Sequence, residues 1–379
     1  MRRLVWTVGA VVFVDTMFYA VIAPLLPQLS HELHLSKLSA GVLTACYPLG
    51  TLLASIPGGV LAVRAGPRFA LCTGLTLLGC STLAFAFIRF AAGLDLARLI
   101  EGVGGACSWA GGLAWLVAET PVERRGATIG QALGAAIGGA LFGPAIGALA
   151  SVPGRGALFS GLSVIAVLLI VLTRGLPHHR ATSGQGAAAL LRVAREPRAR
   201  VGMWLMVLPA IVAGTITVLG PLRLHRFGAG AGVIGLTFLV SSAIEAVISP
   251  VVGGLSDRRG RLAPARAGLI CTGLALLCFT LPTAALPLAA VIVITLAGTG
   301  GLWAPAMAML SDAAEARGVD QALAAALMNL AWAAGQIVGS AGGGGAAKAV
   351  GDALPTTTAA GLCALTLAAL VFAGDRLAR

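Results

Sequence analysis

The sequence predicts an all-α integral membrane protein with twelve transmembrane helices in two pseudo-symmetric six-helix bundles. Its composition, its succession of apolar segments and an internal repeat all support this fold class. The 379 residues are 58% hydrophobic and 11% charged, with a mean hydropathy of +0.94, whereas about 25% of the residues of a soluble domain are charged. The 52 glycines favour closely packed membrane helices, because glycine lets neighbouring backbones approach.

The apolar segments have the length of membrane-spanning helices, because a hydrocarbon core of about 30 Å requires about 20 helical residues. Six occur in the first half, at residues 4–27, 39–61, 70–90, 94–117, 127–150 and 157–173, and six in the second, at 201–222, 231–254, 264–284, 286–310, 322–345 and 356–374. We therefore predict an N-terminal bundle at 1–173, a basic cytoplasmic linker at 174–200 and a C-terminal bundle at 201–379. The linker is equally compatible with a surface helix and with a disordered tether.

The formal net charge of +12 is better explained by membrane topology than by a nucleic-acid partner. The basic residues lie in short segments between apolar runs, and most fall on one side when both termini are placed in the cytoplasm, as the positive-inside rule requires. Almost all of them are arginine, which points to a GC-rich bacterial genome and hence to the inner membrane. The seven cysteines have no spacing typical of disulfides or metal sites, so we expect no metal and no cofactor.

An internal repeat relates the two halves. A shift of 194 residues pairs Gly59 with Gly253, Arg64 with Arg258 and Gly66 with Gly260, and a shift of 196 pairs Gly139, Gly143 and Gly147 with Gly335, Gly339 and Gly343. The matches keep their order over several spans, which indicates a duplication. Two halves related by an axis along the membrane normal suit alternating access around a site near the midplane.

The turn after the second span of each half carries a family motif. In the first half it includes Gly59, Arg64 and Gly66, and in the second half GGLSDRRGR includes Gly253, Asp257, Arg258 and Gly260. These residues resemble the loop motif of the major facilitator superfamily, and the resemblance covers essentially the whole chain. It implies the major facilitator fold and a cytoplasmic gate in which the Asp and Arg contact a neighbouring helix end. Val63 replaces the motif Asp, so we expect a weaker first-half contact; a plain basic loop would leave the glycines unexplained.

Two further motifs refine the resemblance. The fourth span contains Arg98, Glu101, Gly102, Gly104 and Gly105, similar to the superfamily motif linked to proton transfer, and the fifth contains Gly139, Gly143, Pro144 and Gly147, similar to the antiporter motif. With Asp15, Pro24 and Pro27 in the first span, they resemble the 12-helix drug:proton antiporters. A bent helix of small residues is the alternative for the fifth span.

Four charged residues are expected deep within predicted spans rather than near their ends, namely Asp15, Arg98, Glu101 and Glu245. Charges at this depth cost at least a few kcal/mol, so they normally face a cavity or a partner. Desolvation favours the neutral carboxyl and a cationic substrate favours the charged one, so proton and substrate would compete. We expect Asp15 or Glu245 to couple transport to protons. Arg98 and Glu101 lie three residues apart and can pair; this pair is as compatible with tethering helices as with coupling.

Five polar or aromatic residues are candidates for a substrate pocket. They are Tyr19, Trp109, Asn329, Trp332 and Gln336. Tyr19 lies one helical turn from Asp15, and the last three share one side of the eleventh span. Ordinary packing or interfacial anchoring is the alternative for each of them.

We therefore predict a secondary active transporter, a proton-coupled exporter of drugs or small amphipathic metabolites that works as a monomer by alternating access. Its partners would be a small-molecule substrate, protons and the lipid bilayer. An enzyme is not expected, because all five histidines fall in loops and no Walker-type phosphate loop is present. An importer or facilitator of sugars or other metabolites remains an alternative, as does a non-transporting membrane sensor, and the pattern does not identify the substrate.

Overall fold

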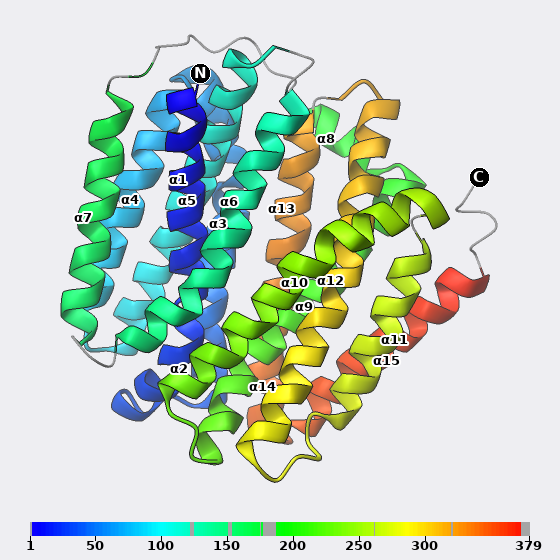
Figure 1. Cartoon of the computed structure of the whole chain (residues 1–379). Helices are drawn as coiled ribbons and strands as arrows, with labels where there is room; N and C mark the ends of the chain where they lie inside the picture. The colour runs from blue at the N-terminus through cyan, green and yellow to red at the C-terminus, as the bar shows by residue number, and fades with distance from the viewer. Residues whose placement is uncertain are drawn as a thin grey trace. The chain divides into compact units, whose positions relative to one another are not determined.

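The computed structural model describes residues 2–121, 125–150, 154–174, 176, 187–260, 262–319 and 321–372, and every regular element in these ranges is a helix. Its internal contacts define two compact units. The first comprises Met1–Leu25 and Cys46–Gln185, and the second comprises Leu26–Ala45 and Gly186–Arg379. The helices are labelled in Figure 1, coloured from the N-terminus in blue to the C-terminus in red.

The first unit is built on three extensively packed helix pairs, α4 with α5, α1 with α6 and α4 with α7. Its helices are α1 (Arg2–Ala20), most of α3 (Lys37–Arg64), α4 (Pro67–Phe87), α5 (Ala91–Glu119), α6 (Arg125–Leu149) and α7 (Arg155–Thr173). The short helix α2 (Ile22–Glu32) follows α1 after a break at Val21. Pro24 explains the break, because its ring removes the hydrogen bond to Ala20 and clashes with that carbonyl.

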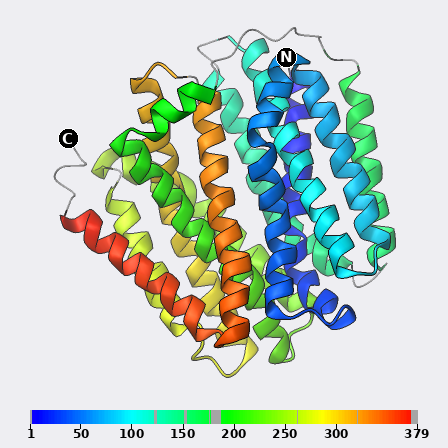
Figure 2. The same ribbon diagram turned by 180° about the vertical axis from the view of Figure 1, so that it is seen from behind.

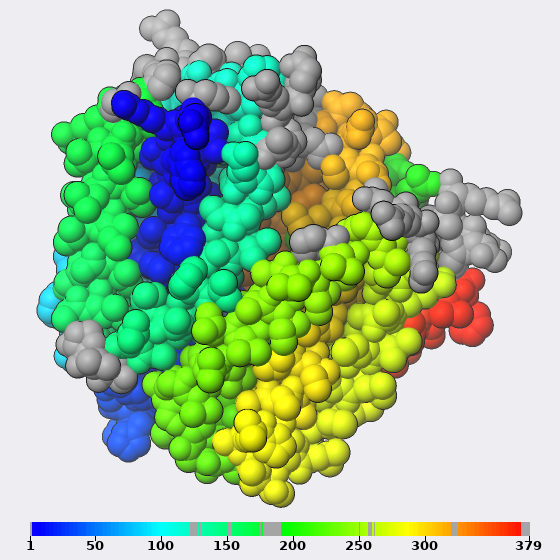
Figure 3. All heavy atoms as spheres, in the orientation of Figure 1, coloured from blue at the N-terminus to red at the C-terminus, as the bar shows by residue number. Residues whose placement is uncertain are grey.

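The second unit packs α9 (Pro197–Arg226), α10 (Ala231–Arg259) and α11 (Leu262–Cys278) against α12 (Ala285–Ala316). Helix α13 (Gln321–Ile337) packs on α9 and continues through a π-helical turn, η2 (Val338–Gly342), into α14 (Gly343–Ala349), and α15 (Ala353–Phe372) ends the described chain. Figure 2 shows α9 in green and α15 in red from behind. Figure 3 shows the side chains of α10 and α12 in close contact.

Twelve long helical segments match the twelve spans predicted from the sequence. Nine of the helices within the described ranges are long and apolar enough to cross a membrane, with α1 and α2 counted as one. The other three segments are α5, which carries buried charges, α11, which has 17 residues, and α13, which has 17 residues before the π-helical turn. The predicted fold class is therefore confirmed.

The predicted linker at 174–200 is partly helical. Helix α8 (Ala187–Ala194) occupies eight of its residues, and residues 175 and 177–186 lie outside the described part. Helix α9 begins at Pro197, four residues before the predicted span. Proline is favoured at the first helical position, because its fixed φ suits the helix and its missing N–H needs no partner there.

The glycine repeat has the same structural role in each unit. In the first, Gly139 of α6 lies so close to α1 that an added Cβ would be 2.2 Å from the Phe13 carbonyl oxygen. In the second, Gly335 of α13 lies equally close to α9, with an added Cβ 2.3 Å from the Val207 carbonyl oxygen. Phe13 and Val207 are themselves 194 residues apart. The repeat in the sequence therefore corresponds to equivalent close helix contacts in the two units, α6 with α1 and α13 with α9.

The two motif turns also adopt the same backbone conformation. Gly66 has φ +99° and ψ 150°, and Gly260 has φ +85° and ψ 155°, a region that is essentially restricted to glycine. We expect Gly66→Ala to lower the free energy of unfolding by about 1–3 kcal/mol, measured as a lower thermal midpoint of the purified protein. Gly59→Ala is the control, because an added Cβ there has no atom within 4 Å. An equal loss in both variants would contradict a conformational cause.

Candidate functional site: a buried polar network around Asp15

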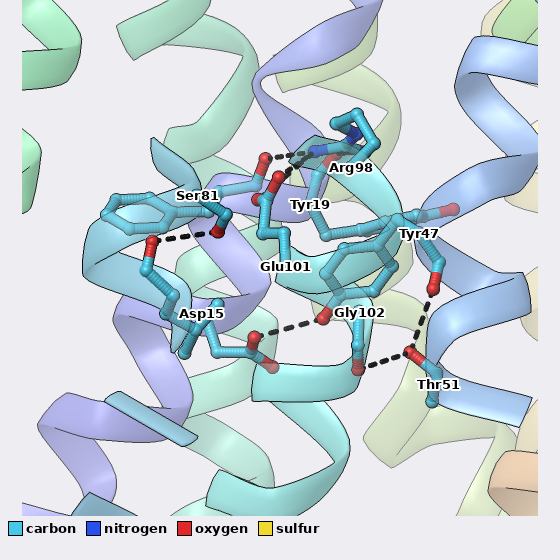
Figure 4. A network of polar contacts seen from close by, with 10 residues as sticks. Asp15, Tyr19, Tyr47, Thr51, Ser81, Arg98, Glu101 and Gly102 are labelled. Carbon is cyan, nitrogen blue, oxygen red and sulfur yellow. Dashed lines mark hydrogen bonds and ion pairs between the residues drawn. The ribbon is translucent and has the colours of Figure 1, made fainter. Parts of the chain in front are cut away.

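Asp15 lies in the interior of the first unit, on α1, and is 1% exposed. Two side chains donate to its carboxylate. The Trp109 Nε1 of α5 lies 2.8 Å from Oδ2, and the Tyr47 hydroxyl of α3 lies 3.0 Å from Oδ1. Figure 4 shows Tyr47 directed at Asp15. Both donors are neutral, so they orient the carboxyl group without neutralising its charge.

Glycines of α5 create the space for this arrangement. A Cβ on Gly105 would lie 2.7 Å from both the Asp15 Oδ1 and the Tyr47 hydroxyl, and a Cβ on Gly102 would lie 1.9 Å from the Tyr47 carbonyl oxygen. Only residues without a side chain allow α3 and α1 to approach α5 at these points. Thr51, one turn along α3, donates to the Gly102 carbonyl at 3.3 Å. The glycines predicted from the motif thus position the acidic residue and its donor.

Arg98 and Glu101 form the predicted ion pair, one turn apart on α5. The Arg98 Nη1 lies 3.0 Å from the Glu101 Oε2, and the two residues are 1% and 4% exposed. The guanidinium also donates to the Phe18 and Tyr19 carbonyls of α1, at 3.1 and 3.3 Å. The Arg98 Cζ lies 5.2 Å from the centre of the Tyr47 ring. The ion pair therefore contacts the tyrosine that donates a hydrogen bond to Asp15.

Replacing only one member of this ion pair is expected to destabilise the protein more than replacing both members. Arg98→Met leaves Glu101 buried without its counter-ion, which costs about 3–5 kcal/mol when an ion pair is buried. In the double variant Arg98→Met, Glu101→Met no charge is stranded, so we expect a smaller loss. Thermal unfolding of the purified variants measures this, with the exposed Arg64→Met as the control. Equal stability of Arg98→Met and the wild type would contradict a buried, coupled pair.

In the second unit, Glu245 lies on α10 against α12. It is partly buried, a Cβ on Gly300 would lie 3.4 Å from its Cγ, and it makes no hydrogen bond or ion pair within the described ranges. The internal repeat, with its shift of 194 residues, pairs Glu245 with Thr51 of the first unit. Thr51 donates a hydrogen bond to the Gly102 carbonyl of α5. The structure therefore places one of the two candidate coupling carboxylates, Asp15 and Glu245, in each unit, in different surroundings.

Gln336 is the other notable polar residue of the second unit. It is 3% exposed, and its Oε1 has no hydrogen-bond partner among the residues that are described. The amide lies beside Gly214 of α9, where an added Cβ would be 2.9 Å from Oε1. Asn329 and Trp332 lie on the same helix and are partly buried. The π-helical turn η2 follows directly, and such turns are frequent at functional sites.

The residues predicted to form the cytoplasmic gate lie at the ends of α3 and α10. Arg64 ends α3 and is exposed, as is Val63 beside it, while Gly253 is partly buried within α10. The side chains of Asp257 and Arg258 lie outside the described part of the structure. The gate therefore stays a prediction.

Sequence reasoning missed two residues. Tyr47 is one of only two tyrosines and packs against the other, Tyr19, with ring centres 5.0 Å apart and the ring planes tilted by 44°. The other missed residue is Asp352, which belongs to no motif and to no predicted span. It lies between α14 and α15, is 8% exposed, and pairs with Lys37, with Arg223 at 3.4 Å and with Arg226 at 3.7 Å. The low abundance of tyrosine was the available signal for Tyr47; no local signal identifies the partners of Asp352.

Comparisons with known proteins agree with these observations. The family model of the Major Facilitator Superfamily matches residues 8–340 and, in a second match, 210–377. The chain is 29% identical over 268 residues to the synaptic vesicular amine transporter of Bos taurus, covering 67% of this chain and 50% of that protein. It is 27% identical over 164 residues to multidrug resistance protein 1 of Bacillus subtilis (strain 168), covering 42% of each. The chain thus spans about half the length of these curated relatives.

Solved structures show the same fold over nearly the full length. A POT family transporter in complex with a thioalcohol-conjugated peptide superposes with a TM-score of 0.79 at 12% identity, covering 99% of this chain and 96% of the other. A bacterial homologue of the human lysosomal transporter Spinster gives 0.74 at 15% identity, with 97% and 94% covered. The chain is a multi-pass integral membrane protein and a member of the major facilitator superfamily, a family of small-molecule transporters and not of enzymes.

Proposed function

We propose that this protein is a proton-coupled exporter that exchanges protons for amphipathic cations, drugs or metabolites, by alternating access. The observation that carries the proposal is the Asp15 carboxylate, which is 1% exposed and, among the described residues, bound only by the neutral donors Tyr47 and Trp109. A carboxylate away from water needs a counter-charge. A proton or a cationic substrate can supply it, and competition between the two couples their movements.

The surroundings of Asp15 support this role. The two terminal nitrogens of Arg98 bind Glu101 and two carbonyls of α1, so it has a partner of its own, while its Nε has none among the described residues. Trp109 and Tyr19 are partly exposed and can offer aromatic faces to a cation. Glu245 of the second unit adds another carboxylate without an ion-pair partner in the described ranges. The similarity to an amine transporter and to a multidrug resistance protein supports the same substrate class.

The glycines of α6 support the proposed exchange of protons for substrate through close helix packing. Gly139 and Gly143 hold α6 against α1, the helix that carries Asp15, and Gly147 lies against Val21 and Pro24 just beyond its end. We propose that this dry contact limits proton leakage beside the coupling carboxylate, as the resemblance to antiporters implies. We further propose that the protein resides as a monomer in a bacterial inner membrane with both termini cytoplasmic. Reporter fusions at each terminus test this orientation.

Transport in proteoliposomes tests the proposed function. Vesicles with an acidic interior and a clamped membrane potential are given ethidium, a permanent cation that does not redistribute by its own titration. Exchange predicts uptake that requires the pH gradient and is absent from protein-free vesicles. Uptake driven only when the exterior is acidic would identify a symporter, and gradient-independent uptake a facilitator. Absence of transport for ethidium and for a panel of amines and sugars would favour a sensor.

A further inference from the structure

An apolar groove lies on the second unit between the beginning of α9 and the end of α15. Its volume is about 600 Å³, within the range of ligand sites. The α9 side is formed by Pro197, Arg200, Val201, Trp204 and Leu205, and the α15 side by Leu362, Leu365, Thr366, Ala369 and Leu370. None of these residues belongs to the polar network or to a family motif. The groove is therefore a separate feature that needs its own explanation.

The walls of the groove are fixed at two points. The Trp204 Nε1 donates to the Thr366 Oγ1 at 2.9 Å, which joins α9 to α15. Arg266 of α11 donates to the Leu370 carbonyl at 2.6 Å, which holds the last turns of α15. Leu205, Thr366 and Leu370 are buried at the base, whereas Leu365 is 70% exposed on the rim. A groove with such fixed walls needs little reorganisation to accept a ligand.

Arg200 is the one charged residue among the residues that line the groove. It is exposed, and its guanidinium makes no hydrogen bond or ion pair within the part of the chain that the structure describes. Glu196, four residues earlier, is the nearest acid along α9, and its carboxylate is already bound by Arg317. The groove thus combines an apolar channel with a positive charge at the start of the helix that has no partner among the described residues.

The dimensions fit one leaflet of a bilayer. From Leu362 to Leu370, α15 advances about 12 Å at 1.5 Å per residue, compared with about 15 Å for half of a 30 Å hydrocarbon core. Arg200 lies in the first turn of a membrane-spanning helix, at the depth of the headgroups, with Trp204 one turn deeper. We propose that this groove binds one anionic phospholipid of the leaflet where α9 begins, with its phosphate on Arg200 and an acyl chain between Trp204 and Leu365.

Charge and shape together favour this occupant. A phospholipid has the required order of groups, a negative phosphate next to a long apolar chain, whereas free phosphate would leave the apolar walls in contact with lipid or water. Basic residues at the membrane surface attract anionic lipids with about 1 kcal/mol each, or about fivefold in affinity. The site is independent of the transport direction and of the substrate.

Native mass spectrometry of the purified full-length protein tests the headgroup contact. The protein is titrated with palmitoyl-oleoyl phosphatidylglycerol and, separately, with phosphatidylcholine of the same chains. We expect one tightly retained phosphatidylglycerol and about fivefold weaker retention in Arg200→Gln. Arg198→Gln is the matched control, because Arg198 is also exposed in the first turn of α9 but does not line the groove.

Two alanines of α15 test the acyl-chain contact without changing any charge. Ala369 lines the groove and Ala368 does not, although both are exposed. We expect Ala369→Trp to weaken retention of both lipids by filling the groove, and Ala368→Trp to leave retention unchanged. Thermal midpoints in the absence of added lipid identify any variant that is misfolded, and for such a variant Ala369→Phe replaces Ala369→Trp.

Three results would overturn the proposal. The first is equal loss of phosphatidylglycerol in Arg200→Gln and Arg198→Gln, which indicates non-specific surface attraction. The second is unchanged retention in Ala369→Trp, which places the lipid elsewhere. The third is a lipid-independent dimer that Ala369→Trp dissociates, which assigns the groove to a second copy. The proposal is supported if Arg200→Gln and Ala369→Trp both weaken phosphatidylglycerol retention while Arg198→Gln and Ala368→Trp leave it unchanged.

Discussion

Asp15→Asn is expected to abolish transport driven by a pH gradient. Asparagine keeps the shape and can still accept a hydrogen bond from Tyr47 or Trp109, but it cannot bind or release a proton. With one proton exchanged per substrate, a gradient of about two pH units can support about 100-fold accumulation, since about 1.4 kcal/mol corresponds to tenfold. The variant should reach a concentration ratio of about one. Ethidium uptake into acidic vesicles with a clamped potential measures this difference.

Controls separate coupling from folding in this experiment. Glu32→Gln changes an exposed carboxylate at the end of α2 and should transport like the wild type. Counterflow without a gradient needs no net proton movement, so it should persist in Asp15→Asn, but at higher ethidium concentrations because the neutral side chain no longer attracts the cation. Tyr47→Phe, which removes one donor, should slow coupled uptake without abolishing it. Wild-type accumulation in Asp15→Asn would show that Asp15 is not the coupling site and would direct attention to Glu245→Gln.

Gly139→Ala is expected to reduce both the thermal stability of the protein and its gradient-driven transport. The added Cβ would lie 2.2 Å from the Phe13 carbonyl oxygen and 3.0 Å from the Met17 nitrogen. These are backbone atoms, so α6 must move away from α1. Overpacking typically costs about 1–3 kcal/mol and occasionally more, and here it also displaces the helix that carries Asp15. We expect a lower thermal midpoint together with reduced gradient-driven uptake.

Gly134→Ala is the matched control on the same helix. Gly134 is exposed, and an added Cβ there would have no atom within 4 Å. Alanine is favoured over glycine in a helix by about 1 kcal/mol, so this variant should be as stable as the wild type or slightly more stable. A lower thermal midpoint for Gly139→Ala, with an unchanged or higher midpoint for Gly134→Ala, would establish close packing as the reason for glycine at position 139. The same loss in both would argue against the α1–α6 contact.

The polar network also explains why the motif glycines and the acidic residues occur together. Gly102 and Gly105 let Tyr47 and Asp15 meet against α5, and Arg98 joins α5 to the carbonyls of α1. A shift between α1 and α5 would therefore change both the hydrogen bonds of Asp15 and the contacts of Arg98. This connection offers a route by which protonation of one carboxylate can bias a helix movement, as exchange by alternating access requires.

The sequence by itself determined the membrane class, the twelve helical segments and the glycine repeat. These follow from local properties, because a segment of about 20 apolar residues spans a bilayer wherever it occurs. Asp15 was recognisable because a carboxylate inside such a segment is costly, and the Arg98–Glu101 pair because residues three apart share a helix face. The family motifs added the identity of the fold.

Only the tertiary structure decided which side chains Asp15 meets. Its two donors are 32 and 94 residues away, on α3 and α5, and their approach depends on the rotation of each helix and on the missing side chain of Gly105. The ion pairs of Asp352 and the groove between α9 and α15 likewise join segments that are distant in sequence. Hydrophobicity fixes which residues enter the membrane, but it acts without direction. The contacts among those residues are set by packing, which a pattern along one chain does not specify.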